Sequence, residues 1–326
     1  MPKNRERIWL VTGGAGFIGS NIAEELARQG KRVRVLDNLS TGKRSHMASF
    51  IDRVDFMKGD IRNLDACRRA MKGVDYVCHQ AAIRSVPKSV DRPTESHDCN
   101  ATGTLNMLIA ARDAKVKRFV YASTSSAYGD DTKFPQKEEY RPAPLSPYGA
   151  SKLCGEHYCI IFTKAYGLET ISMRYFNVFG PRQDPESLYS AVIPKFMEQA
   201  YYGKPLEVHW DGKQSRDFTH VRNVVSANIL ACKSKKGIGE MMNIANGRSY
   251  SLVDIIRVLE KILGRKLEQH HTPKRAGDVR KTWADISKAK RLLGYKPVMG
   301  FEDGLKDTWS YFLDHYFKAG AKAARS

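Results

Sequence analysis

Short apolar runs alternate with amphipathic stretches through the first half of the chain. The apolar runs cover 8–12, 33–37, 54–58, 76–79, 119–123 and 170–174. Most of them lack strict apolar–polar alternation, which is typical of parallel strands buried on both faces. The stretches between them, such as 18–28 and 102–114, show helical periodicity. This order predicts an α/β fold, a doubly wound parallel sheet of the Rossmann type with helices on both faces.

The rhythm changes after Arg174. Gly and Pro residues within 180–185 predict a loop, and helices are expected at 192–202, 252–263 and 301–316. The small, basic tail at 318–326 is expected to fray. We therefore predict a dinucleotide-binding domain at 1–178, with a return segment near 218–248. A second, smaller mixed α/β lobe for the substrate would be built mainly from 179–326.

The chain is strongly basic. Lys and Arg total 54 against 35 Asp and Glu, a formal net charge of +19, which makes nucleic acid and anionic membranes candidate partners. The basic residues are scattered, however, so we expect an anionic small-molecule substrate and no nucleic acid. No apolar run reaches the roughly 18 residues of a membrane-spanning helix. The first residues also lack the apolar stretch of a secretory signal, and no membrane association is expected.

Six cysteines are spread along the chain without a C-x-x-C pair. Cys154 and Cys159 flank His157, an arrangement that could suit a metal ion, but half-buried thiols on a helix are the favoured interpretation. We therefore expect no metal. The cysteine pattern suits a reducing compartment and predicts a cytoplasmic protein.

A glycine-rich segment joins the first predicted strand to the first predicted helix. Gly13 would permit a tight turn, Gly16 would let the backbone approach a pyrophosphate, and Gly19 would let the helix pack closely on the sheet. The N–H groups at the helix N-terminus would then face the phosphates. The spacing is G-x-x-G-x-x-G, which differs from the common G-x-G-x-x-G fingerprint. The prediction of a dinucleotide site therefore rests largely on the strand before the glycines and the helix after them.

Asp37 ends the second predicted strand, where a carboxylate can accept hydrogen bonds from the adenosine ribose. It would repel a 2′-phosphate, which favours NAD over NADP. Lys43 and Arg44 lie nearby and could accommodate a phosphate, so the alternative stays open. Asp60 follows the third strand and could reach the adenine amino group.

Tyr148 and Lys152 are spaced i, i+4 in a predicted helix that follows Pro147, so both face the same way. Thr124 follows a predicted strand, at the sheet edge where open α/β sheets bind ligands. A tyrosine with a pKa near 10 is a poor base, and a lysine ammonium and a positive nicotinamide ring would both lower that pKa. With the Thr124 hydroxyl holding the substrate oxygen, this set would remove a hydroxyl proton while hydride leaves the same carbon.

At these residues the chain resembles the extended short-chain dehydrogenase/reductase family, and within it the nucleotide-sugar 4-epimerases. The resemblance covers nearly the whole chain and rests on ordered blocks at 12–19, 37–38, 59–60, 79–82, 100, 146–152, 174–181, 215–218 and 275–278. It implies NAD as cofactor and a UDP-sugar as substrate, with Thr124, Tyr148 and Lys152 as the catalytic residues.

The resemblance also implies the binding residues. The cofactor would contact Gly13, Gly16, Phe17, Ile18, Asp37, Asn38, Asp60, Ile61, Gln80, Ala81, Ala82, Asn100, Tyr148, Lys152 and Tyr175, with Tyr175 packed by the nicotinamide. The substrate would contact Arg84, Ser85, Thr124, Ser125, Ser126, Tyr148, Asn177, Val192, Arg216, Arg275, Asp278 and Thr282. Within that set Asn177, Arg216 and Arg275 would hold the diphosphate, and Asp278 would meet the uridine ribose.

The expected reaction is inversion at C4 of the sugar through a 4-keto intermediate. Related dehydratases carry an Asp-Glu pair after the catalytic threonine, and related decarboxylases a glutamate, whereas this chain has Ser125 and Ser126. Thr282 stands where narrow-range galactose-type epimerases carry a tyrosine, which leaves room for an N-acetyl group. Segments 85–89 and 182–185 also resemble the N-acetylhexosamine-preferring subgroup.

We therefore expect interconversion of UDP-GlcNAc and UDP-GalNAc, with UDP-glucose and UDP-galactose as further substrates. Arg84 could meet a carboxylate, which keeps a UDP-glucuronate 4-epimerase as the alternative. A non-catalytic NAD-bound scaffold or RNA-binding protein is disfavoured because the three catalytic positions are intact. The family pairs its subunits through helices, so a homodimer through 102–114 and 148–166 is expected.

Overall fold

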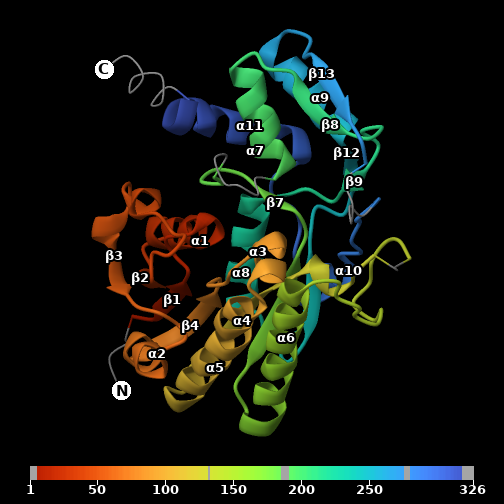
Figure 1. Ribbon diagram of the computed structural model, residues 1–326. Helices are drawn as coiled ribbons and strands as arrows, with labels where there is room; N and C mark the ends of the chain where they lie inside the picture. The colour runs from red at the N-terminus through yellow and green to blue at the C-terminus, as the bar shows by residue number, and fades with distance from the viewer. Residues whose placement is uncertain (1–5, 131–132, 185–190, 275–279, 318–326) are drawn as a thin grey trace.

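The computed structural model describes residues 6–130, 133–184, 191–274 and 280–317. Among these, seven strands form one parallel sheet in the order β11-β6-β5-β4-β1-β2-β3 (Figure 1). The strands are β1 (Ile8–Thr12), β2 (Arg32–Asp37), β3 (Val54–Lys58), β4 (Val74–His79), β5 (Arg118–Thr124), β6 (Thr170–Tyr175) and β11 (Met241–Ile244). The predicted parallel sheet is confirmed, and the first six strands agree with the predicted runs to within two residues.

Helices cover both faces of this sheet. They are α1 (Phe17–Arg28), α2 (Leu64–Met71), α5 (Gly103–Asp113), α6 (Pro147–Tyr166) and α8 (Val221–Lys233). The short helices α3 (Val86–Asp91) and α4 (Pro93–His97) pack against α6. Alternate residues of β1 face opposite ways: Trp9 and Val11 pack in one core with residues of α1 and α8. Ile8 and Leu10 pack in another with residues of α2, α5 and α6. Both sides of the strand are therefore apolar, as the sequence pattern predicts.

The chain returns to the sheet after entering the second lobe. Helix α8 packs on the sheet, and β11 pairs in parallel with β6, with Met241 opposite Ser172. Helix α10 (Ser287–Leu293), which the sequence analysis does not predict, joins the same core through Ala289 and Leu293. Late segments of the chain thus complete the lobe that the early segments begin.

The second lobe holds α7 (Val192–Tyr201), α9 (Leu252–Leu263) and α11 (Phe301–Phe312), which a π turn at Leu313–Phe317 extends. Three short strand pairs accompany them: β7 (Val178–Phe179) with β10 (Thr219–His220), β8 (Leu206–His209) with β13 (Gln269–Thr272), and β9 (Ser215–Arg216) with β12 (Tyr250–Ser251). A separate apolar core joins the three helices through residues such as Phe196, Ile255 and Leu305. The three helices predicted here are confirmed.

In the described part of the chain, no helix has the length and apolar character needed to cross a bilayer.

Candidate functional site

The glycine-rich loop has the geometry of a close approach between backbones. Gly13 has a φ of +64°, and a Cβ there would lie 2.8 Å from the Cα of Ala81. A Cβ on Gly19 would lie 2.1 Å from the carbonyl oxygen of Gly13, so only glycine allows α1 to start here. Gly16 is the N-cap of α1 and makes no side-chain hydrogen bond to the helix. The backbone N–H groups of the first turn, which begins with Phe17 and Ile18, are therefore suited to binding an anion.

Asp37 lies at the end of β2 beside this loop. Its carboxylate accepts hydrogen bonds from the backbone N–H of Ala15 at 3.0 Å and of Leu39 at 2.8 Å. Burial raises the pKa of Asp37 and outweighs the lowering by these two bonds. Lys43, one of the residues that could have favoured a 2′-phosphate, pairs with Asp184 at 2.9 Å. Arg44 lies over the ring of Phe56. The surroundings of Asp37 therefore suit NAD.

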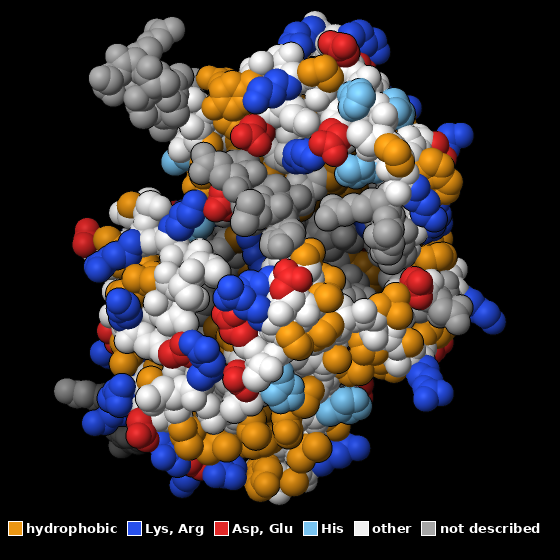
Figure 2. Space-filling model, in the orientation of Figure 1, with side chains coloured by type: hydrophobic (Ala, Val, Ile, Leu, Met, Phe, Trp, Pro, Cys, Tyr) orange, Lys and Arg blue, Asp and Glu red, His pale blue; other side chains and the backbone are white. Residues whose placement is uncertain are grey.

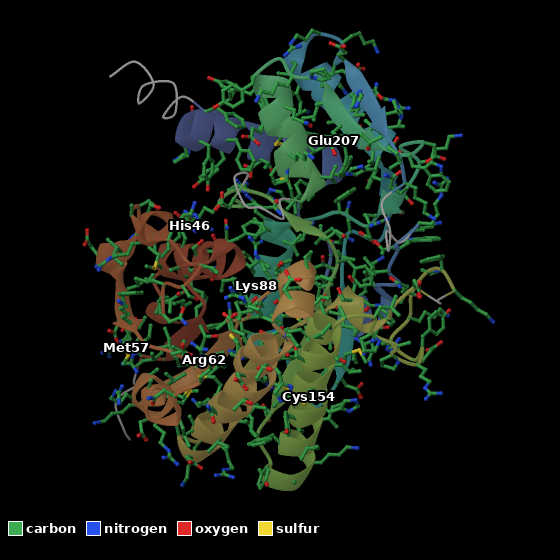
Figure 3. All side chains as sticks on the ribbon, viewed as in Figure 1. His46, Met57, Arg62, Lys88, Cys154 and Glu207 are labelled. Carbon is green, nitrogen blue, oxygen red and sulfur yellow. The ribbon has the colours of Figure 1, made fainter. Side chains whose placement is uncertain are left out.

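Asp60 is held in place at the end of β3. It accepts a hydrogen bond from the Asn38 amide at 2.9 Å and pairs with Arg62 at 2.7 Å. The hydrogen bond with Arg62 is the main reason that the pKa of Asp60 falls to about 2. Arg62 is labelled in Figure 3. Ile61, the residue before it, is buried.

A chain of hydrogen bonds runs from Ala81 into the interior of the protein. The N–H of Ala81 donates to the Thr12 hydroxyl at 3.2 Å, which lies 2.6 Å from Nδ1 of His79. Nε2 of His79 lies 3.1 Å from the Thr104 hydroxyl, and that hydroxyl donates to the carbonyl of Asn100. Burial lowers the pKa of His79 to about 3, so the ring is neutral. These bonds fix the backbone at Ala81, which faces Gly13.

Asn100 links the segment after Ala82 to α6 by hydrogen bonds. Its amide oxygen accepts from the N–H of Ile83 at 2.8 Å, and its nitrogen donates to the hydroxyl of Ser151 at 3.1 Å. Ser151 in turn donates to the carbonyl of Tyr148. Asn100 therefore positions both the segment after Ala82 and the start of α6.

Thr124 and Tyr148 are hydrogen-bonded to each other, and Lys152 lies one turn along the same helix as Tyr148. Thr124 is the last residue of β5, and Ser146 caps α6 so that Tyr148 lies in its first turn. Burial raises the pKa of Tyr148, while a hydrogen bond with Thr124 and the charge of Arg84 lower it. Burial is the largest of these effects, and the lowered pKa that the sequence analysis expects includes the charge of a bound nicotinamide ring, so it stays a prediction.

Lys152 is almost fully buried one turn further along α6. Its ammonium lies 4.3 Å from the centre of the Tyr121 ring, a cation–π contact. Burial lowers the pKa of Lys152 to about 8. The lysine that would assist Tyr148 is therefore itself held in an environment that disfavours its charge.

A buried ion pair continues this face of α6, and the sequence analysis does not identify it. Glu156 receives two hydrogen bonds from Arg174 of β6, at 2.9 and 2.8 Å, and a short one from Ser123 of β5. Removing one partner of such a pair would leave an uncompensated buried charge. The pair fixes α6 against the strands that carry Thr124 and Tyr175.

The segments predicted to meet the sugar border the same catalytic residues. Ser85 caps α3, and Ser89 of α3 accepts a hydrogen bond from the backbone N–H of Tyr148 at 3.1 Å. Arg84 is exposed, Ser125 and Ser126 form a 3-10 turn after Thr124, and Val192 begins α7. Figure 3 shows Lys88 of α3 near the junction of the two lobes and Cys154 on α6.

Asn177 and Thr282 contact each other directly. The Thr282 hydroxyl accepts from the Asn177 amide at 3.0 Å and lies 3.4 Å from the backbone nitrogen of Asp217. The backbone N–H of Thr282 donates to Ser215, beside Arg216. Thr282 therefore connects two residues predicted to hold the diphosphate. Arg275 and Asp278 lie outside the described residues.

Asp217 is a further residue that the sequence analysis assigns no role. Its buried carboxylate accepts hydrogen bonds from the backbone N–H groups of Asn246, Gly247 and Ala284. Burial nevertheless raises its pKa to about 7. Because it follows Arg216 directly, it fixes the end of β9 that presents Arg216.

Comparison with known proteins identifies the family. The chain matches the model of the NAD dependent epimerase/dehydratase family over residues 9–245. A UDP-glucose 4-epimerase from Thermotoga maritima, solved with UDP-glucose, is 38% identical, with a TM-score of 0.89 over 94% of this chain and 99% of that one.

Two further solved structures are similar. A UDP-N-acetylglucosamine 4-epimerase from Methanobrevibacter ruminantium M1, in complex with UDP-N-acetylmuramic acid, is 35% identical, with a TM-score of 0.90 over 95% of this chain and 98% of that one. A UDP-glucuronic acid 4-epimerase from Bacillus cereus, with UDP-glucuronic acid and NAD, is also 35% identical, with a TM-score of 0.86 over 95% and 100%. With the glycine loop, Asp37 and the Thr124–Tyr148–Lys152 set in place, the chain belongs to the NAD dependent epimerase/dehydratase family.

Proposed function

We propose that this protein is a UDP-sugar 4-epimerase that interconverts UDP-GlcNAc and UDP-GalNAc. The observation that carries the reaction is the hydrogen bond between Tyr148 and Thr124, the last residue of β5, with Lys152 one turn after Tyr148 on α6. The solved relatives named for 4-epimerase activity, each at 35–38% identity over at least 94% of this chain, support the same reaction class.

The residues of the glycine loop and Asp37 would hold NAD. The glycines of the loop keep side chains away from the start of α1, where the pyrophosphate would bind. The carboxylate of Asp37 is held by two backbone N–H groups and would accept hydrogen bonds from the adenosine ribose. Bound NAD would supply a hydride acceptor and donor for C4 of the sugar. The protein residues alone leave the pKa of Tyr148 raised, and a positive charge on the cofactor would lower it.

In this mechanism Tyr148 takes the proton of the sugar 4-hydroxyl while Thr124 orients that oxygen. The ammonium of Lys152 favours the phenolate form of Tyr148. The 4-keto sugar then turns about its diphosphate and presents its other face, and Tyr148 returns the proton to the 4-oxygen. Asn177 and Arg216 would hold the diphosphate during this turn, with Thr282 and Asp217 fixing their positions. Ser125 and Ser126 offer no carboxylate for dehydration.

The choice of the N-acetyl sugar rests on the size of Thr282. Discrimination comes from what a pocket excludes as well as from what it attracts. A tyrosine at this position would fill space that an acetamido group needs. UDP-glucuronate is the second candidate, because the exposed guanidinium of Arg84 acts on Tyr148 and could meet a carboxylate.

The test is turnover of UDP-GlcNAc, UDP-glucose and UDP-glucuronate, with products separated by chromatography. The parent protein should prefer UDP-GlcNAc, and Thr282→Tyr should suppress that reaction while largely sparing UDP-glucose.

Thr282→Val is the matched control, since it removes the hydroxyl that binds Asn177 without adding bulk. If Thr282→Val changes the ratio of kcat/KM values as much as Thr282→Tyr does, the hydroxyl and not the space sets the preference. Preference of the parent for UDP-glucuronate would refute the N-acetyl assignment.

A further inference from the structure

Three polar side chains from distant parts of the chain meet in an apolar setting. Tyr175 ends β6, Gln80 follows β4, and Asn228 lies in the middle of α8. Nδ2 of Asn228 donates to the Tyr175 hydroxyl at 2.8 Å, and Nε2 of Gln80 lies 3.3 Å from the same oxygen. Nε2 of Gln80 also donates to Oδ1 of Asn228 at 3.1 Å. We call these residues the Asn228 triad.

The backbone fixes the orientation of the triad. Nδ2 of Asn228 also donates to the carbonyl of Val224 at 2.8 Å, which only the nitrogen of the amide can do. Oδ1 must therefore face Gln80, and Gln80 must present its nitrogen. The Tyr175 oxygen accepts both amides, so its position is set from two sides.

This arrangement is poor for stability. Asn228 is fully buried, and Oε1 of Gln80 is buried with no hydrogen-bond partner among the described residues. An unsatisfied buried acceptor costs about 1–3 kcal/mol. The surroundings are apolar, and Tyr175 and Val224 belong to the same core cluster. A leucine in place of Asn228 would suit the apolar neighbours, but it would remove the donor to the Tyr175 hydroxyl and the acceptor for Nε2 of Gln80, so its effect on stability has to be measured beside its effect on function.

The triad lies between the two halves of the candidate site. Gln80 immediately precedes Ala81, the residue that Gly13 approaches. Tyr175 lies directly opposite Thr124 in the register of β6 and β5. A dinucleotide that starts at the glycine loop and ends at Thr124 would pass this point with its nicotinamide half.

We propose that Asn228 is a positioning residue for the nicotinamide end of the cofactor site. It acts through Tyr175 and Gln80, which it holds in one arrangement, and it does not touch the substrate. The expected effect of Asn228 on turnover rests on the proposed function. The expected effect of Asn228 on cofactor binding does not depend on which sugar is converted.

The experiment compares the holoprotein with Asn228→Leu and with a matched control, Asn223→Leu. Asn223 is equally buried on the same helix, but it bonds to the backbone of Val298 and Met299 and not to the triad. Asn228→Asp is a second variant, because it keeps the shape but lacks the N–H donors. Three quantities are measured: kcat and KM with the preferred UDP-sugar, the unfolding temperature, and displacement of bound NAD by ADP-ribose, which lacks nicotinamide.

For Asn228→Leu we expect kcat to fall by about 10- to 100-fold, the range for small misplacements of reacting groups. KM should change little, and the unfolding temperature should fall by no more than that of Asn223→Leu. ADP-ribose should displace NAD more easily by about fivefold or more, the lower end of couplings between linked sites. Asn228→Asp should share the changes in kcat and in the displacement assay. Asn223→Leu should unfold at a lower temperature yet match the parent in kcat and in the displacement assay.

Parent-like kcat and displacement in Asn228→Leu would overturn the inference. Equal losses in Asn228→Leu and Asn223→Leu, in step with their unfolding temperatures, would also overturn it, because both would then be structural. If the parent converts no UDP-sugar, the proposed function fails, and the displacement assay alone decides the role of Asn228.

Discussion

Replacing Lys152 by methionine should separate stability from catalysis. Methionine fills a similar volume and carries no charge, so the substitution removes the buried ammonium without opening a large cavity. The pKa of Lys152 is about 8 against an ordinary value of 10.5, because burial disfavours the cation. Each pH unit between these values is worth about 1.4 kcal/mol. Keeping Lys152 charged in the folded protein therefore costs about 3 kcal/mol below pH 8.

The sign follows from proton binding. Between about pH 8 and 10.5 the unfolded chain binds a proton at Lys152 that the folded protein does not. The stability of the parent therefore rises with pH in that window through this group, and below pH 8 the full cost is present. The cation–π contact with Tyr121, at 4.3 Å, is among the interactions that this net cost already includes. At pH 7 Lys152→Met should thus be more stable than the parent by up to about 3 kcal/mol.

The assay is urea unfolding of both proteins at a series of pH values, with turnover measured in parallel. Lys152→Met should lose most of its activity, and its stability advantage should shrink between pH 8 and 10.5. Lys164→Met on the same helix is the control, since Lys164 is exposed. The free energy of unfolding of this variant should stay close to that of the parent at every pH. A Lys152→Met variant that is destabilised by several kcal/mol at pH 7, or whose difference does not vary with pH, would refute the reasoning.

Three further predictions concern the site and the assembly. Tyr148→Phe should abolish epimerisation and keep UDP-sugar binding, and activity within about tenfold of the parent would show that another group is the base. Protein purified without added cofactor should release NAD on denaturation, because Asp37 is fixed toward the ribose position; NADP as the main nucleotide would contradict this. Light scattering should find a homodimer, because Ile161 and Tyr166 of α6 are exposed and hydrophobic side chains gather at the lower end of the molecule in Figure 2; a monomer at micromolar concentration would contradict it.

The parts of the site that follow from short-range pattern could be predicted from the sequence. The strand that ends at Asp37, the glycine spacing, and the i, i+4 pair Tyr148 and Lys152 each lie within one element or one connection. The apolar runs predict the sheet for the same reason, since burial on both faces is recorded in consecutive residues.

The rest depends on contacts between segments that are far apart in the chain. Asn228 reaches Gln80 and Tyr175 only because α8 returns to the sheet, and no local pattern marks it. The pair of Glu156 and Arg174 is likewise invisible until α6 packs on β6. Charges that lower the pKa of Tyr148 can be read from the sequence, whereas the degree of burial that raises that pKa cannot.

The place of β11 at the edge of the sheet has a consequence for synthesis of the chain. Its pairing with β6 joins Met241–Ile244 to Thr170–Tyr175, so the ribosome must make the intervening segment before β6 gains its second neighbour. At about 5–20 residues per second, β6 has an open edge for several seconds. An unpaired apolar strand is a template for association with other chains. We expect the nascent protein to need protection during this interval, and chains truncated before residue 241 to aggregate even though they contain the whole glycine loop and Tyr148.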